Sequence, residues 1–198
     1  VQAINLGGIT AGALRQTRVG EVSLWKACAF ANASRNGIFA GFAAAEGMIG
    51  PAAMFEGEKG FMKVISGSSA LPELGGSNGS SYKILDTYIK PHPVEYHAQS
   101  AVEAAFSIRE QMIAEYGECS VHRIQSIIVG SGEVAIEIIG RDPEKWHPKT
   151  RETADHSLPY CVAAALADGK ISPQSFSRYR LRDTVLFDLM QKIRVEEV

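Results

Sequence analysis

The spacing of apolar and polar residues changes along the chain, and the change falls near residue 80. Residues 22–49 are rich in alanine and glycine between apolar residues. Because small side chains let helices approach closely, we predict a helix here, whole or broken at a glycine, deep in a multi-helix packing. Gly50 and Pro51 end this pattern. Residues 58–65 predict a further short helix.

A stretch rich in glycine and serine follows, at residues 66–81 (SGSSALPELGGSNGSS). Such a composition is typical of a linker or a mobile loop. It predicts a domain boundary near residue 80. A long surface loop within one domain is the alternative that the sequence leaves open.

After residue 81 the chain mixes strand and helix patterns, which predicts an α+β fold class without a βαβ repeat. The expected strands are residues 82–89, a hairpin formed by 121–129 and 133–139 with its turn at 130–132, and a last strand at 194–198. The expected helices are residues 97–116, residues 157–167 with Gly169 directly after them, and residues 181–193.

Composition limits the class of protein. The chain has 198 residues, 45% of them hydrophobic and 21% charged, which is typical of a soluble globular protein. A net charge of −2 argues against a general nucleic-acid partner. No apolar run without a charge is long enough to cross a membrane, and three scattered cysteines fit a reducing, cytoplasmic compartment. Because the chain begins at Val1 and no signal peptide precedes it, we expect both ends to be cuts within a longer protein.

Motifs for nucleotides and metals are missing from the sequence. The Gly-Gly pairs lack the spacing of a dinucleotide or phosphate loop, and the five histidines and three cysteines form no ligand motif. Cys161 follows His156 by five residues, which is the wrong helical spacing for a hydrogen bond along one face. We therefore expect no metal site and read Cys161 as a buried helix residue.

Residues 150–160 (TRETADHSLPY) combine an arginine, two acids, a histidine and a tyrosine, side chains that are suited to anion binding or proton transfer. Ser157 is a plausible N-cap, and the free N–H groups at such a helix start favour an anion. His156 exchanges a proton near neutral pH, and Tyr160 can donate a hydrogen bond. The alternative is a capping motif whose charges are merely solvated.

Two lysines lie in constrained positions. Lys90 stands at a predicted strand end, directly before a turn with two prolines, and a rigid lysine is a good anchor for a carboxylate. Lys26 lies among apolar residues and alanines, so it must reach solvent, a partner or a ligand. The alternatives are that Lys90 lies in an ordinary surface turn and that Lys26 extends its ammonium along the apolar surface to solvent. With Arg151, His156 and Tyr160, these groups suit a substrate with several carboxylates.

The same segments closely resemble one family. Residues 15–26 (RQTRVGEVSLWK) and 150–160 (TRETADHSLPY), with the shorter runs 36–40, 47–51, 55–57, 145–146 and 168–169, look like the MmgE/PrpD family. The forms of the first two segments are most similar to the branch that dehydrates 2-methylcitrate. The family also contains enzymes that decarboxylate cis-aconitate and epimerise iminodisuccinate. Glu95 and Gln99 stand where the decarboxylating branch carries histidines, which argues against decarboxylation.

The resemblance implies an architecture. Family members pair an all-helical domain with a smaller α/β lid domain and usually form homodimers in which no metal or organic cofactor takes part. Residues 1–80 are then the end of the main segment of the all-helical domain, and residues 81–198 are the α/β lid domain. Further parts of the family's active site belong to an earlier helical segment.

The resemblance also implies a reaction, loss of water from the tricarboxylate 2-methylcitrate to give 2-methyl-cis-aconitate during propionate breakdown. Lys26 and Lys90 match family lysines and would bind carboxylates, with Arg151 as an additional anchor. His156 would transfer or orient a proton, and Tyr160 would donate to a carboxylate or the leaving oxygen. A general base is required, but the sequence does not identify it. The alternatives are another family activity, such as decarboxylation of cis-aconitate, and an inactive truncated fragment.

Overall fold

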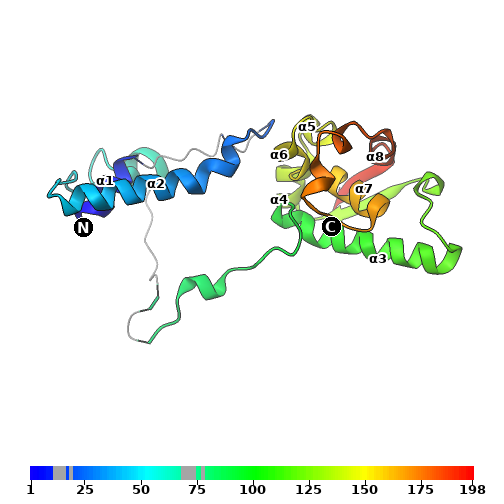
Figure 1. The fold of residues 1–198 in the computed structure, drawn as a ribbon, viewed down its shortest axis with the longest axis horizontal. Helices are drawn as coiled ribbons and strands as arrows, with labels where there is room; N and C mark the ends of the chain where they lie inside the picture. The colour runs from blue at the N-terminus through cyan, green and yellow to red at the C-terminus, as the bar shows by residue number, and fades with distance from the viewer. Residues whose placement is uncertain (11–16, 18–19, 68–74, 77–78) are drawn as a thin grey trace. The chain divides into compact units, whose positions relative to one another are not determined.

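The computed structural model describes residues 1–10, 17, 20–67, 75–76 and 79–198. The chain divides into two compact units (Figure 1). The first comprises Val1–Thr17 and Leu24–Tyr88, and the second comprises Arg18–Ser23 and Ile89–Val198. Most of the expected linker at 66–81 lies outside the described residues. The assignment of residues 1–80 and 81–198 to an all-helical and a lid domain stays a prediction.

Two helices form the body of the first unit, α1 (Gln2–Thr10) and α2 (Trp25–Ala45). A Cβ on Gly7 would lie 3.9 Å from the Cβ of Ala40, so small residues let the two helices approach closely. The expected helix at 22–49 is confirmed in type, and its glycines do not break it. A π-helical turn, Met62–Ser66, covers part of the short helix expected at 58–65.

The expected deep packing of α2 is wrong for the described residues. Ala40 is the buried residue of this helix, and several large apolar side chains are more than half exposed: Phe30, Ile38, Phe39 and Phe42. The physical reason is that α1, with nine residues, covers only one stripe of a helix of 21 residues.

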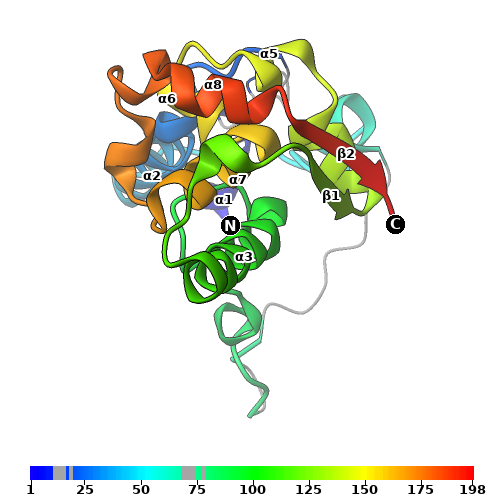
Figure 2. The same ribbon diagram turned by 90° about the vertical axis from the view of Figure 1, so that its right-hand side faces the viewer.

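The second unit is built around one buried helix, α7 (Leu158–Asp168), whose first nine residues are all buried. Figure 2 shows α7 between α3 (Gln99–Tyr116) and α8 (Thr184–Met190). A short helix, α5 (Pro143–Trp146), also contacts α7. The helices expected at 97–116, 157–167 and 181–193 are therefore confirmed within a few residues at each end.

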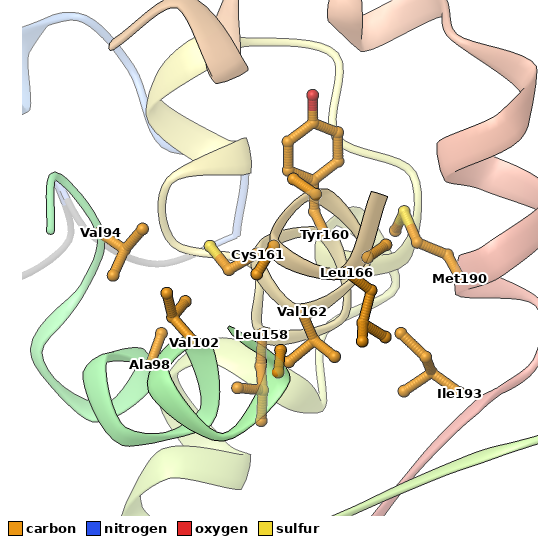
Figure 3. Close-up of a cluster of buried hydrophobic side chains, with 14 of the residues drawn as sticks. Val94, Ala98, Val102, Leu158, Tyr160, Cys161, Val162, Leu166, Met190 and Ile193 are labelled. Atoms are coloured by element: carbon orange, nitrogen blue, oxygen red, sulfur yellow. The ribbon is translucent and has the colours of Figure 1, made fainter. Parts of the chain in front are cut away.

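Side chains from all these elements make one core (Figure 3). The residues labelled in Figure 3 are Val94, Ala98, Val102, Leu158, Tyr160, Cys161, Val162, Leu166, Met190 and Ile193. Cys161 is fully buried, as expected. This core holds α7 in place, and the candidate site begins at the N-terminal end of that helix.

The expected hairpin is wrong. The strand β1 (Ile127–Ser131) pairs in parallel with β2 (Ile193–Glu197), with Ile127 opposite Ile193. Residues 133–139 instead form α4 (Glu133–Ala135) and a π-helical turn. Ala135 and Ile139 are both buried, and their spacing of four places them on one helical face. A run of β-branched residues fits both patterns, and packing decides between them. The strand expected at 194–198 is confirmed.

The strand expected at 82–89 is also wrong. Its centre is a 3₁₀ turn, Lys83–Asp86, and its apolar side chains are exposed. In the described part of the chain no neighbouring strand pairs with this segment, and an isolated strand leaves its backbone groups without partners. The described residues are thus mostly helical with one two-stranded sheet, consistent with the α+β class. None of the described helices has the length and apolar character that crossing a membrane requires.

Candidate functional site

The site is built at the N-terminus of α7. Ser157 caps this helix, because its Oγ accepts a hydrogen bond from the backbone N–H of Tyr160 at 3.1 Å. The same hydroxyl donates to the carbonyl oxygen of Lys145. Pro159 occupies the first turn, where a missing N–H costs nothing. The expected cap is confirmed, and it fixes the preceding residues against the core.

A second capped turn, α6 (Arg151–Ala154), precedes α7 and is hydrogen-bonded to the segment around Val22, which is distant in the sequence. The backbone N–H of Val22 donates to Thr153 Oγ1 at 3.1 Å, and Thr150 Oγ1 donates to the carbonyl of Val22 at 3.3 Å. The ammonium of the buried Lys145 donates to the carbonyl of Gly20 at 3.4 Å. The two threonines of the motif therefore bind the chain that leads to Lys26, a role the sequence interpretation missed.

His156 lies between the two helices with a carboxylate on its ring. Its Nδ1 is 2.5 Å from Asp155 Oδ1, and the two side chains are 13% and 20% exposed. A carboxylate hydrogen-bonded to Nδ1 orients an imidazole ring and leaves the other ring nitrogen for a ligand. The pair is thus suited to proton transfer at a surface. Asp155 was named in the motif but given no role, and its place next to the histidine is the signal that could have identified it.

The turn that carries Lys90 lies against this pair. The backbone N–H of Glu95 donates to the carbonyl oxygen of Asp155 at 2.8 Å. Within the turn, the Lys90 ammonium donates to the Val94 carbonyl at 3.0 Å. The structure therefore joins two segments, about sixty residues apart in the chain, that the sequence singled out separately.

Gln99 holds the turn in shape. Its side-chain oxygen accepts from the backbone N–H of His92 at 3.1 Å, and its amide nitrogen donates to the carbonyls of His92 and Val94 at 2.9 and 3.1 Å. Glu95 Oε2 accepts from the backbone N–H of His97 at 2.7 Å. Both side chains bind backbone here, and sequence reasoning had considered them only as departures from a family pattern.

Tyr160 is placed differently from what we expected. It is fully buried, its hydroxyl donates to the carbonyl of Ser175 at 2.8 Å, and its ring packs on Phe176. Burial raises the pKa of Tyr160 above its usual range, against an opposing effect of the Arg180 charge. In Figure 3 the Tyr160 hydroxyl points away from the other labelled side chains of the cluster, and it is buried against the Ser175 carbonyl. Its hydroxyl is thus engaged with the backbone, and a catalytic role for Tyr160 stays a prediction.

The remaining candidates are less constrained. Arg151 is exposed at the start of α6. Lys26 is half-buried in α2 and belongs to the first unit, whereas the other four candidates belong to the second. Among the described residues no three His, Cys, Asp or Glu side chains gather in a way that could hold a metal ion.

These features define a class: an α+β domain that presents a histidine–aspartate pair and a lysine turn beside the N-terminus of a buried helix. The sequence profile of the MmgE/PrpD N-terminal domain matches residues 1–73, and that of the MmgE/PrpD C-terminal domain matches residues 92–198. The chain belongs to the MmgE/PrpD family, which confirms the resemblance drawn from the motifs.

Individual relatives carry two different activities in their names. The 2-methylcitrate dehydratase of Escherichia coli (strain K12) is 31% identical over 105 residues, which are 53% of this chain and 21% of that protein. The cis-aconitate decarboxylase of Homo sapiens is 27% identical over 171 residues, 83% of this chain and 33% of that protein. A probable 2-methylcitrate dehydratase of Saccharomyces cerevisiae is 30% identical over 101 residues, 51% of this chain and 19% of that protein. The chain spans about a fifth to a third of the length of these relatives.

Proposed function

We propose that this chain is part of a lyase that removes water from 2-methylcitrate, or from a closely related tricarboxylate, to give 2-methyl-cis-aconitate. The observation that carries the proposal is the hydrogen bond from Glu95 N–H to the Asp155 carbonyl. It joins the backbone of the turn that carries Lys90 to the backbone of Asp155, next to His156. A substrate anchor beside a proton-transfer group is the minimum that such an elimination requires.

The reaction sets the demands on the site. A base removes a proton from carbon while an acid assists the departing hydroxide, and cationic groups hold the carboxylates and the negative charge that develops. In the proposal Lys90 and Arg151 bind carboxylates, and Lys26 contributes a further anchor. His156, oriented by Asp155, moves a proton. Tyr160 acts through the packing of α7, in place of the direct donation expected from the sequence.

The wider setting belongs to the same proposal. We take the working enzyme to be a cytoplasmic homodimer that uses neither metal nor organic cofactor, as the family resemblance implies. The chain's own residues would then supply the charge stabilisation that a metal supplies in other dehydratases.

Decarboxylation of cis-aconitate is the second candidate, because the human decarboxylase aligns with 83% of this chain. Two residues favour dehydration over it. By the family resemblance, Gln99 and Glu95 stand where the decarboxylating branch carries histidines, and here both are engaged with backbone N–H and carbonyl groups of the Lys90 turn. They therefore do not supply the groups that the decarboxylating branch has at these positions.

Product analysis tests the proposal. The full-length protein is incubated with 2-methylcitrate and, separately, with cis-aconitate, each with and without EDTA, and the products are followed by proton NMR. We expect 2-methyl-cis-aconitate from the first substrate at the same rate with and without the chelator. Release of CO₂ from cis-aconitate without turnover of 2-methylcitrate would assign the second activity, and EDTA-sensitive turnover that a metal restores would refute the cofactor-free part.

A further inference from the structure

A basic pocket lies on the second unit, apart from the residues assigned to the proposed reaction. Its volume is about 690 Å³. It is lined by four basic side chains, His147, Lys149, Arg178 and Arg182, and by three apolar ones, Pro148, Leu181 and Phe187. None of the described residues that line it is acidic, although the chain as a whole carries a net charge of −2. The pocket is therefore a local concentration of positive charge.

Two nearby aspartates pair with Arg180, and neither Arg178 nor Arg182 has a carboxylate partner among the described residues. Arg180 pairs with both oxygens of Asp168 at 2.8 Å and also with Asp183. No acidic side chain in the described part of the chain lies within ion-pair distance of Arg178 or Arg182. The sequence RYRLR at 178–182 thus neutralises its middle arginine and leaves the outer two for an external anion.

Both walls of the pocket are held by the fold. On one side the His147 ring stacks on Phe187 of α8, with ring centroids 6.4 Å apart and an interplanar angle of 20°. On the other side the backbone N–H of Arg182 donates to the Tyr179 carbonyl at 3.0 Å, and the Arg180 ion pairs anchor the turn to the end of α7. Walls that are fixed before binding lower the entropic cost of holding a ligand.

We propose that this pocket binds a small, multiply charged oxyanion, either a polycarboxylate or a phosphate compound. Two guanidinium groups match the paired oxygens of carboxylate and phosphate, and Lys149 adds a point charge. Leu181 and Phe187 offer an apolar surface to a carbon skeleton.

The two arginines carry most of the binding. His147 and Lys149 also line a smaller neighbouring pocket together with the carboxylates Glu21 and Glu144, so they are less available to an external anion than the two arginines. The inference does not rest on the proposed lyase reaction.

Calorimetric titration of the full-length protein tests the inference. Citrate and inorganic phosphate are the two probes, each titrated separately. We expect saturable binding of at least one, and a dissociation constant raised tenfold or more in the double variant Arg178→Gln/Arg182→Gln. Both arginines are exposed, so the variant should keep its circular dichroism and melting temperature. Tighter binding of citrate identifies a polycarboxylate site, and tighter binding of phosphate identifies a phosphate site.

Two further variants make the outcome decisive. Arg141→Gln removes an exposed arginine that already pairs with Glu137 at 3.3 Å, and it should bind both probes as the wild type does. Lys90→Ala removes an anchor of the proposed substrate site, so citrate binding that is lost in this variant is assigned to that site, whereas phosphate binding should be retained. The inference is overturned if neither probe saturates, if the double variant binds both probes unchanged, or if all binding is lost in Lys90→Ala and kept in the double variant.

Discussion

His156 and Tyr160 are four residues apart in the chain but lie in different surroundings. His156 keeps part of its ring at the surface, with Asp155 on one nitrogen. Tyr160 is enclosed and donates its hydroxyl to the Ser175 carbonyl. Residue type alone assigned both to proton chemistry, because the sequence does not say which face of a helix is covered. At this scale the structure shows a partly exposed His156–Asp155 pair and an enclosed Tyr160 hydroxyl, and the roles of both residues stay predictions.

Removing the Tyr160 hydroxyl should destabilise the protein without changing turnover per folded molecule. Tyr160→Phe leaves the buried Ser175 carbonyl without its donor, which should lower the free energy of unfolding by about 1–2 kcal/mol. Urea unfolding measures the loss. Tyr179→Phe, at a side chain that is 81% exposed, is the matched control and should change nothing. Reduced turnover at full stability in Tyr160→Phe would restore the tyrosine to the catalytic group.

The same tyrosine predicts a pH dependence. Burial raises the pKa of Tyr160 in the folded protein, whereas an unfolded tyrosine titrates near pH 10. A raised folded pKa contributes stability that is complete below the unfolded pKa and is lost as the pH rises above it. The wild type should therefore lose stability above about pH 10 more steeply than Tyr160→Phe. Parallel pH profiles of the two proteins would contradict this.

Asp155 should act on the reaction through His156. Asp155→Asn keeps the side-chain size but replaces the carboxylate that is hydrogen-bonded to His156 Nδ1 and orients the ring, so kcat should fall roughly ten- to a hundredfold. A positioning role also predicts a shifted pH profile of kcat, which a purely structural role would leave in place. Asp86→Asn, at an exposed aspartate in the first unit, should behave as the wild type. An unshifted profile with normal kcat in Asp155→Asn would remove the pair from the mechanism.

At the scale of elements, the sequence predicted helices well where capping residues and apolar spacing agreed. Ser157 and Gly169 mark the two ends of α7 and occupy the expected cap positions, and Pro159 lies in its first turn. The strand prediction for residues 133–139 failed because a segment with β-branched residues at alternate positions can also form a helix. In that helix Ala135 and Ile139 form the buried face. The parallel pairing of β1 with β2 joins segments more than sixty residues apart, and no local pattern encodes such a contact.

The C-terminal end of α7 supports a prediction of its own. Gly169 has a φ of +67°, and a Cβ there would lie 2.6 Å from Arg109 Nε. That guanidinium donates to the carbonyls of Leu166 and Ala167. Gly169→Ala should therefore cost about 1 kcal/mol or more of stability, through backbone strain and displacement of the arginine.

A glycine elsewhere gives the control with the opposite sign. Gly37 lies inside α2, where a Cβ would meet no atom within 4 Å. Gly37→Ala should stabilise the first unit by up to about 1 kcal/mol, because alanine is the better helix former. Chemical unfolding of both variants checks the pair. Equal effects of the two substitutions would show that the left-handed backbone at Gly169 is not what matters.

At the scale of the whole molecule, the motifs of the sequence led to the correct family but not to the geometry of its site. Residues 150–160 carried the resemblance, and the family profiles confirm it across both units. The contact between the Lys90 turn and Asp155 could not be predicted, because it depends on how the chain folds back after α3. The exposed apolar side chains of α2 show the limit of composition, since small residues indicate close packing without showing what supplies it.

The central claim is that the Lys90 turn belongs to the substrate site of a lyase. The most direct measurement is kcat/KM for 2-methylcitrate in Lys90→Ala of the full-length protein, beside Lys59→Ala at an exposed lysine of the first unit. Loss of a charge-assisted hydrogen bond to a carboxylate costs about 1.5–3 kcal/mol, so kcat/KM should fall roughly ten- to a hundredfold in Lys90→Ala with its melting temperature retained. Lys59→Ala should match the wild type. Wild-type kcat/KM in Lys90→Ala would contradict the account.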